Sequence, residues 1–296
     1  MDPILRLGLG SIVVGVVVLG LKWLAFMMTG SVALYSDALE SLVNLATAGV
    51  TLFAVRLSLE PPDANHHFGH HKVEYFSAVF AGVLIVVAAM AILREAWAAY
   101  LAPRVLDAPF EGAAVNLVAA AINGTWATIL VRYGRLRRSP ALAADGRHLM
   151  SDVMTSIGVV AGVLLAAATG WSVLDPAMAA AVAVGILWSG WVVIRDSLGG
   201  LMDVAVPEET QARIRDVISE QAGGALEAHD LRTRRAGPAI FVEFHLVVAG
   251  EMTVAESHEI CDRIEEALKA GVPGARPVIH VEPEHKAKHP GGVPVI

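Results

Sequence analysis

The sequence has only one cysteine, Cys261, among its 296 residues. A single thiol can form neither an intramolecular disulfide nor a cluster of thiolate metal ligands, so both are excluded. Charged residues are also scarce, at 17% of the chain, where soluble domains carry about 25%. The net charge of −7 leaves no basic excess for a nucleic-acid partner. The low charge instead indicates that much of the chain lies in an apolar environment.

Long apolar runs fill the chain before residue 205, and charged residues recur every few positions after it. A helix needs roughly 20 mostly apolar residues to cross the hydrocarbon core of a bilayer. The stretches that qualify are Leu7–Met28, Val32–Leu57, Val73–Leu101, Phe110–Tyr133, Leu142–Thr169 and Val173–Ile194. The first is longer than a signal-peptide core and lacks a clear small-residue cleavage site, so we interpret it as a retained helix. The sequence therefore predicts a six-helix transmembrane domain over residues 1–204.

Lysine and arginine in the loops predict the orientation of these spans, because basic loops stay in the cytoplasm. The second connection carries Arg56 and Lys72, the third carries Arg104, and the first and fifth carry neither residue type. The fourth connection is the most basic, with Arg132, Arg135, Arg137, Arg138 and Arg147. This pattern predicts a multi-pass protein of the cell inner (plasma) membrane whose N-terminus and C-terminal half are cytoplasmic.

The C-terminal half reads as a small α/β domain over residues 205–285. Its predicted elements are a helix from Pro207 to Ala222, strands at Ala228–Arg235 and Ala239–Val248, a helix at Val254–Ala270 and a strand at Arg276–Glu282. The order α-β-β-α-β predicts one open sheet in a metallochaperone-like domain. The tail over residues 286–296, with two glycines and two prolines, is predicted to be disordered.

Two predicted spans carry ionisable or amide side chains, which are costly in a bilayer and usually mark function. Glu40 and Asn44 lie four residues apart in the second span, and His148 and Asp152 do so in the fifth. Residues four apart share a helix face, so two facing helices can surround one ion with four ligands. The alternative is that these side chains pair among themselves and only stabilise helix packing. Two such pairs in separate spans favour a metal site.

The donor types fit a divalent cation. One imidazole, two carboxylates and an amide oxygen can form the tetrahedral set that zinc favours. Iron(II), cobalt and cadmium fit less selectively, and the lack of a thiolate argues against copper(I). Asp37, one turn from Glu40, could also ligate, relay protons or cap a neighbour. Asn116 and Asn123 in the fourth span are predicted to form interhelical hydrogen bonds.

Four segments resemble motifs of the cation diffusion facilitator family. They are residues 36–44 (Ser-Asp-Ala-Leu-Glu-Ser-Leu-Val-Asn), the pair His148 and Asp152, residues 62–70 (Pro-Asp-Ala-Asn-His-His-Phe-Gly-His) and residues 229–234 (His-Asp-Leu-Arg-Thr-Arg). Six spans followed by a small cytoplasmic α/β domain is that family's plan, so the resemblance covers nearly the whole chain. It is similar above all to the bacterial zinc and ferrous-iron efflux proton antiporters.

The chain departs from the pattern of the zinc-exporting branch in its second span. That branch usually has two aspartates where this chain has Glu40 and Asn44. Glutamate reaches one methylene further, and asparagine removes a charge, which bears on metal identity and affinity. The manganese branch usually lacks the fifth-span histidine, so His148 argues against manganese.

The resemblance implies two further metal sites outside the membrane. The first, in the second loop, would use Asp63, His66 and His70; the alternative is a solvated loop with adventitious affinity. The second, a cytoplasmic site near a dimer interface, would use His229, His245, His258, His280 and Glu282. Glu282 stands where relatives have aspartate, and the alternative is plain surface or core histidines.

The resemblance also implies a salt bridge between Lys72 and Asp203 at the hinge of a homodimer; otherwise these are two exposed charges at a membrane surface.

The sequence therefore predicts a homodimeric transporter in the lipid bilayer that exports zinc, or another of these divalent metals, in exchange for protons by alternating access. Metal binding to deprotonated ligands releases protons, which links the two fluxes. The main alternative is a membrane-anchored metal sensor or buffer that binds zinc through cytoplasmic histidines without moving it. An enzyme is not expected, because no acid/base motif accompanies a three-ligand metal set.

Overall fold

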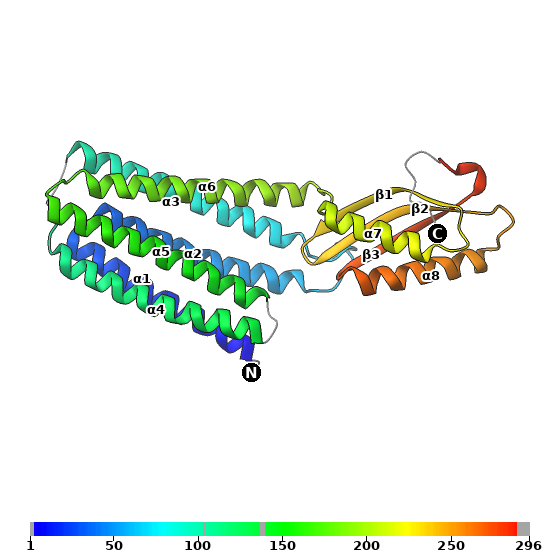
Figure 1. Cartoon of the computed structure of the whole chain (residues 1–296), viewed down its shortest axis with the longest axis horizontal. Coiled ribbons are helices and arrows are strands. Elements are labelled where there is room, and N and C mark those ends of the chain that lie inside the picture. Colours follow the sequence, from blue (N-terminus) through cyan, green and yellow to red (C-terminus); the bar gives the residue numbers. More distant parts are fainter. Residues whose placement is uncertain (1–2, 103–104, 137–139, 289–296) are drawn as a thin grey trace. The chain divides into compact units, whose positions relative to one another are not determined.

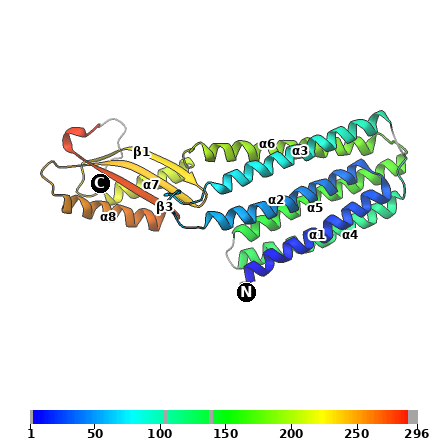
Figure 2. The ribbon, with the colours of Figure 1, turned by 180° about the vertical axis from the view of Figure 1, so that it is seen from behind.

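The computed structural model describes residues 3–102, 105–136 and 140–288. Within these residues, six helices are long and apolar enough to cross a membrane, and a small α/β region follows them (Figures 1 and 2). The helices are α1 (Pro3–Thr29), α2 (Val32–Ser58), α3 (Val73–Leu101), α4 (Pro109–Leu136), α5 (Pro140–Thr169) and α6 (Leu174–Leu201). The predicted fold class is confirmed. Of the loop arginines that predict orientation, Arg104, Arg137 and Arg138 lie outside the described residues.

Hydropathy located the helices well but set their ends less well. Helix α3 has the predicted bounds, whereas α6 continues past the predicted Ile194 to Leu201. The apolar run stops at Arg195 and Asp196, but the backbone hydrogen bonds of the helix continue through these polar residues. A hydropathy run therefore marks the lipid-contacting part of a helix and not its whole length.

The contacts divide the chain into two compact units. The first comprises residues 1–52 and 79–194, and the second comprises residues 53–78 and 195–296. In the first unit, small residues let helices approach closely, as is usual in membranes. A Cβ added at Gly112 of α4 would collide with Thr29 of α1, and one at Gly146 of α5 would lie 2.8 Å from the Ala127 carbonyl of α4.

The end of the first unit where α2 begins is tightly closed. An apolar cluster there is almost fully buried: Ala25, Val32, Ala33, Leu34, Ile92, Ala96, Val159, Val163, Ala179 and Ala183. The carboxylate of Asp175, in the first turn of α6, accepts hydrogen bonds from the backbone N–H groups of Val32 (2.7 Å) and Ala33 (3.3 Å) and from the Ser31 hydroxyl. Because a carboxylate satisfies the free N–H groups of a helix N-terminus, Asp175 fixes the start of α2 to α6.

The second unit contains a three-stranded sheet and two helices. Its elements are α7 (Glu208–Gln221), β1 (Glu227–Ala236), β2 (Ala239–Val248), α8 (Val254–Gly271), β3 (Ala275–Pro283) and the short 3-10 turn Glu284–Lys286. The strand order is β1-β2-β3, with β1 and β2 antiparallel and β2 and β3 parallel. Gly237, at φ 54°, makes the tight turn between β1 and β2, because glycine adopts positive φ without strain.

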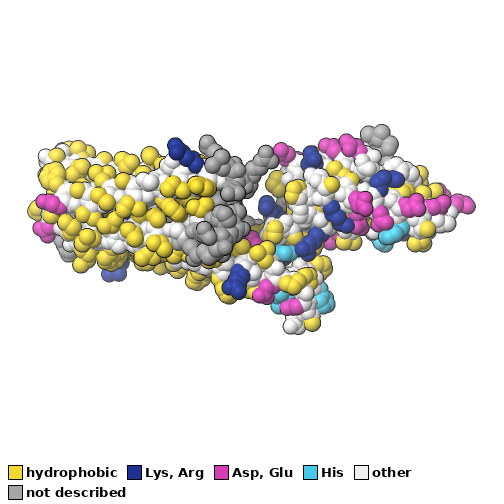
Figure 3. All heavy atoms as spheres, turned by 90° about the horizontal axis from the view of Figure 1, so that it is seen from below, with side chains coloured by type: hydrophobic (Ala, Val, Ile, Leu, Met, Phe, Trp, Pro, Cys, Tyr) yellow, Lys and Arg dark blue, Asp and Glu magenta, His cyan; other side chains and the backbone are white. Residues whose placement is uncertain are grey.

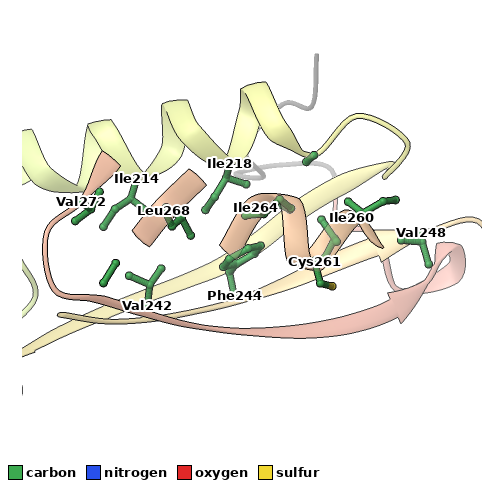
Figure 4. Packing of buried hydrophobic residues seen from close by; sticks show 14 of the residues in the cluster. Ile214, Ile218, Val242, Phe244, Val248, Ile260, Cys261, Ile264, Leu268 and Val272 are labelled. Atoms are coloured by element: carbon green, nitrogen blue, oxygen red, sulfur yellow. The ribbon is translucent and has the colours of Figure 1, made fainter. Parts of the chain in front are cut away.

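The core of this unit lies between the sheet and its two helices (Figure 4). Helices α7 and α8 contribute Ile214, Ile218, Ile260, Ile264 and Leu268, and β2 contributes Val242, Phe244, Leu246 and Val248. Alternate residues of a strand face opposite sides of a sheet. His245, which alternates with these core residues, therefore lies on the sheet face away from α7 and α8.

The surface differs between the two parts of the chain. In the view of Figure 3, hydrophobic side chains cover the helices, whereas lysine, arginine, acidic and histidine side chains gather over the α/β region. Large exposed apolar side chains on the helices include Phe53, Phe80, Val87 and Trp188. This surface suits hydrocarbon and not water. The predicted domain boundary at residue 204 stays a prediction, and of the predicted tail only residues 286–288 are described.

Candidate metal sites

Helices α2 and α5 bring together polar side chains of the predicted transport site. The Asn44 amide nitrogen donates a hydrogen bond of 3.0 Å to Asp152 Oδ2, and His148 Nε2 lies 4.0 Å from the same oxygen. Asp152 is buried, Asn44 and Glu40 are half-buried, and 57% of the His148 side chain is exposed. Glu40 lies near enough to Asp152 for the two carboxyl groups to interact electrostatically.

These four groups do not form a closed ligand shell in this structure. In a compact metal site, one ligand atom from each residue lies within 4.8 Å of the others. Among the described residues, Glu40, His148 and Asp152 do not meet this condition together. An amide donor already occupies one oxygen of Asp152. The set therefore offers carboxylate, amide and imidazole donors in neighbouring positions. To bind one cation, Glu40 and His148 would have to move closer to Asp152.

Asp37 is placed differently from these residues. Its Oδ1 accepts hydrogen bonds from Lys22 Nζ (2.7 Å) and the Ser156 hydroxyl (2.9 Å), and its Oδ2 accepts one from the Asn116 amide (2.9 Å). The interhelical hydrogen bond predicted for Asn116 is thus present, whereas the bond predicted for Asn123, which is also buried, stays a prediction. Protein donors use both carboxylate oxygens, so in this arrangement Asp37 has little capacity left for a metal.

The loop cluster of Asp63, His66 and His70 is compact, with one ligand atom from each within 4.8 Å of the others. His66 Nδ1 lies 3.2 Å and His70 Nε2 lies 3.5 Å from the Asp63 carboxylate. Backbone N–H groups of Asn65 and His66 donate to Asp63 Oδ1, and these bonds hold the pKa of that carboxyl below its usual range. The carboxylate therefore stays ionised and available to a cation. The three predicted ligands lie where one metal could bind them.

Replacing both His66 and His70 with alanine is expected to lower zinc affinity at this loop more than about tenfold, because two of three donors are lost. Isothermal titration of the full-length protein in detergent would measure the lost binding event. His67→Ala is the matched control, since its Nε2 instead lies 3.1 Å from the Ala64 carbonyl. Equal zinc binding by the double variant and the wild type would contradict the assignment.

The sheet of the second unit aligns three of the predicted cytoplasmic ligands in one row. His229 of β1 is paired with His245 of β2, and His245 is paired with His280 of β3. Glu282, two residues after His280, lies on the same face. Its carboxylate oxygens lie 3.3 Å from His229 Nε2, 3.2 Å from His245 Nδ1 and 3.7 Å from His280 Nε2.

Two nitrogens of this row support a cation site. Among the described residues, His229 Nε2 and His245 Nδ1 are buried without a hydrogen-bond partner, although both face Glu282. Buried polar atoms are rarely left unpaired. On its other side, His229 Nδ1 is 3.0 Å from Glu227 Oε1, the kind of contact that fixes the tautomer of a metal-binding histidine. His229 and His245 are therefore candidate ligands for a zinc ion, although the compact group that they form is with Asp230 and not with Glu282.

His258 is not brought to this row. It lies on α8 with 73% of its side chain exposed, and its Nε2 is 3.6 Å from Asp262. Its assignment to the cytoplasmic site stays a prediction. The sequence analysis missed Asp230, whose carboxylate groups with His229 and His245. Its position next to His229 was a signal, but the β-bulge and the φ of 52° that orient it were not readable from the sequence.

Replacing His245 with alanine is expected to lower the zinc-dependent rise in the melting temperature of the full-length protein, leaving only the part that zinc at the other sites contributes. Zinc stabilises only the folded state that binds it, by about 2.7 kcal/mol at a concentration 100 times Kd. Thermal unfolding with and without zinc would measure this difference. His285→Ala, an exposed histidine in the turn after β3, is the control. A full zinc-dependent rise in the His245 variant would count against the site.

Lys72 and Asp203 form the predicted ion pair within one chain. Lys72 Nζ lies 2.9 Å from Asp203 Oδ1, and Arg234 Nη1 lies 3.4 Å from the same oxygen. The hydrogen bond from Lys72, followed by the charges of Lys72 and Arg234, holds the pKa of Asp203 below its usual range. The role of the pair at a dimer hinge stays a prediction.

Comparison with known proteins agrees with this architecture. The family profile described as "Cation efflux transmembrane domain" matches residues 9–202, and "Cation efflux protein, cytoplasmic domain" matches residues 206–284. An uncharacterized transporter of Synechocystis sp. is 42% identical over 96% of this chain and 93% of its own length. The cation-efflux pump FieF of Pectobacterium atrosepticum is 34% identical over 91% of this chain and 89% of its own.

Among solved structures, the zinc form of CzrB is 51% identical over 29% of this chain and 97% of that chain, with a TM-score of 0.28. The two family profiles between them cover nearly the whole sequence, with the boundary between them falling after the sixth helix. The protein is therefore a multi-pass membrane transporter of the cation diffusion facilitator family, whose members carry out cation efflux.

Proposed function

We propose that this transporter exports zinc from the cytoplasm in exchange for protons, by alternating access of a site between α2 and α5. The contact of Asn44 with Asp152, with His148 one turn away on the same helix, is the observation that carries the proposal. It places donors from two spans side by side in a part of the chain where ionisable groups are costly. A sensor or buffer would have no use for such groups inside the membrane.

Proton exchange follows from the chemistry of the donors. Metals bind neutral imidazole and ionised carboxylate, so zinc and protons compete for His148, Asp152 and Glu40. Imidazole groups titrate at about pH 6.5 in model peptides, so a histidine ligand can bind zinc at neutral pH and regain a proton at a more acidic face. Asn44 cannot titrate, which favours a small proton count of about one per metal ion.

Zinc is the proposed substrate, and iron(II), cadmium and cobalt are the alternatives. The membrane donors are nitrogen and oxygen atoms, which suit all four ions, and a tetrahedral arrangement suits zinc best. The cation-efflux name of FieF supports a cation as the substrate, and the donor set carries the preference for zinc.

The α/β region is proposed to be cytoplasmic and to join two copies in a homodimer at the inner (plasma) membrane. Strand β3 lies at the edge of the sheet and exposes Val278, an apolar side chain that a second copy would cover. Zinc at the histidine row would favour one arrangement of the pair and so adjust transport to cytoplasmic zinc.

The decisive test is reconstitution in proteoliposomes with a zinc-sensitive dye inside. Zinc should enter faster when the lumen is more acidic than the bath, since outward proton flow then drives inward zinc flow. A protonophore should remove this acceleration. The alternative sensor or buffer would bind zinc without any luminal signal. Repeating the assay with iron(II), cadmium, cobalt and manganese would rank the substrates.

A further inference from the structure

A polar cluster outside the proposed ligand set joins four helices of the first unit. It consists of Lys22 of α1, Asp37 of α2, Asn116 of α4 and Ser156 of α5, which we call the four-helix node. All four side chains are buried, with Lys22 and Asp37 each 1% exposed. Each of the other three residues donates a hydrogen bond to the Asp37 carboxylate. The cluster is therefore centred on one buried ion pair.

The node lies directly beside the proposed transport site. Asp37 precedes Glu40 by three residues on α2, and Ser156 follows Asp152 by four residues on α5. Because α2 and α5 run in opposite directions, both steps lead the same way, towards the end where α2 begins. Under the proposed orientation this is the side from which the metal leaves.

Side chains are more deeply buried beyond the node than on the other side of the transport site. Beyond the node lie the buried apolar cluster around Leu34 and Val163 and the tie of Asp175 to the start of α2. On the other side, Glu40 and Asn44 are half-buried and His148 is largely exposed. Burial along α2 thus falls from the node to the stretch of residues 39–53, which are half-buried or exposed.

The composition of the node suits a contact that opens and closes. A buried ion pair is held by mutual charge compensation, and losing either partner leaves an uncompensated charge. Among the described residues, the Asn116 amide oxygen is buried without a hydrogen-bond partner, so the network is incompletely satisfied. A network with every hydrogen bond satisfied would hold the four helices together more strongly than this one.

We infer that Lys22 and Asp37 are positioning residues that close the transport path on the side where α2 begins, and that metal is released there only when the node separates. This inference rests on the proposed function, because it presupposes a metal between α2 and α5. In the closed node the Lys22 ammonium blocks a divalent cation by charge as well as by size. Asp37 acts by pairing with Lys22 and not as a metal ligand.

The test compares Lys22→Met, Asp37→Asn and a double variant that exchanges the two residues, Lys22→Asp with Asp37→Lys. Each single change should lower the rate of zinc transport at least about tenfold. The zinc Kd of the transport site in the detergent-solubilised protein should stay within about threefold of the wild-type value, a difference of about 0.65 kcal/mol. The double variant rebuilds the ion pair with its charges exchanged, so it should recover most of the transport rate. A double variant that binds zinc but stays inactive would overturn the inference, as would single variants that transport at the wild-type rate.

Side-specific labelling supplies a second readout that a general loss of packing would not reproduce. In a Cys261→Ser background the reporter Asn44→Cys is the only thiol. With the node intact, an impermeant thiol reagent should label it in inside-out vesicles and not in right-side-out vesicles. Lys22→Met should raise labelling in right-side-out vesicles several-fold, and the variant with the exchanged pair should reverse this. Unchanged labelling would overturn the gate, whereas wild-type zinc transport by Asp152→Ala would overturn the transport site itself.

Discussion

Replacing Asp152 with alanine is expected to abolish proton-driven zinc uptake into proteoliposomes. Asp152 is the buried carboxylate on which Asn44 and His148 converge, so its loss removes a ligand, a negative charge and the partner of the Asn44 amide. A loss on the order of 100-fold or more in apparent affinity corresponds to about 2.7 kcal/mol of binding free energy. Initial uptake rates over a range of zinc concentrations would measure it.

Two variants separate loss of a ligand from loss of folding. Asp152→Asn keeps the size of the side chain and should be almost as inactive, because it removes the charge that zinc requires. Asp145→Asn, on the same helix, alters a carboxylate that instead accepts a hydrogen bond from Ser11 and should retain at least half of the activity. Uptake at the wild-type rate by Asp152→Ala would show that the metal passes elsewhere.

Replacing Asn44 with aspartate is expected to raise zinc affinity at least about tenfold near neutral pH, or 1.4 kcal/mol. The Asn44 amide now donates to Asp152 at 3.0 Å. An aspartate has no such donor when ionised, so two carboxylates would face each other at close range and repel. Zinc relieves this repulsion, and so does a proton, which zinc must then displace. Affinity should therefore rise more steeply with pH, with more protons released per zinc ion.

Calorimetric zinc titrations at several pH values, in buffers of different ionisation enthalpy, would measure both affinity and proton release. Asn44→Ala is the control, because it removes the amide without adding a charge and should weaken binding. If Asn44→Asp left affinity and proton release unchanged, Asn44 would lie outside the ligand shell. The substitution also tests whether the asparagine sets a lower affinity than two acidic residues would give.

The fold followed from the sequence because its main signals are local. Long apolar runs and a shift to charged residues near residue 205 were enough to place six helices and the α/β region. The pairs at positions 40 and 44 and at positions 148 and 152 followed from helix periodicity. Their contact across α2 and α5 was a prediction about two facing helices, and the hydrogen bond between Asn44 and Asp152 provides that contact.

The parts that were missed depend on long-range packing. Lys22 lies in the first span, where a charge is itself a signal, yet only the tertiary structure pairs it with Asp37. That pairing changes the interpretation of Asp37 from a candidate ligand to the acceptor of a buried ion pair. Likewise, the sequence could not supply the strand register that aligns His245 with His280, or the bulge that turns Asp230 towards them.

The row of histidines has a consequence for how the sheet assembles. A slip of β3 by one residue along β2 would turn His280 and Glu282 to the opposite face and carry them away from His245. Zinc held by this row would therefore stabilise the native pairing alone, by mass action. Zinc would therefore select the native strand register during folding. When zinc is abundant, a smaller fraction of newly made chains should fold with mispaired strands.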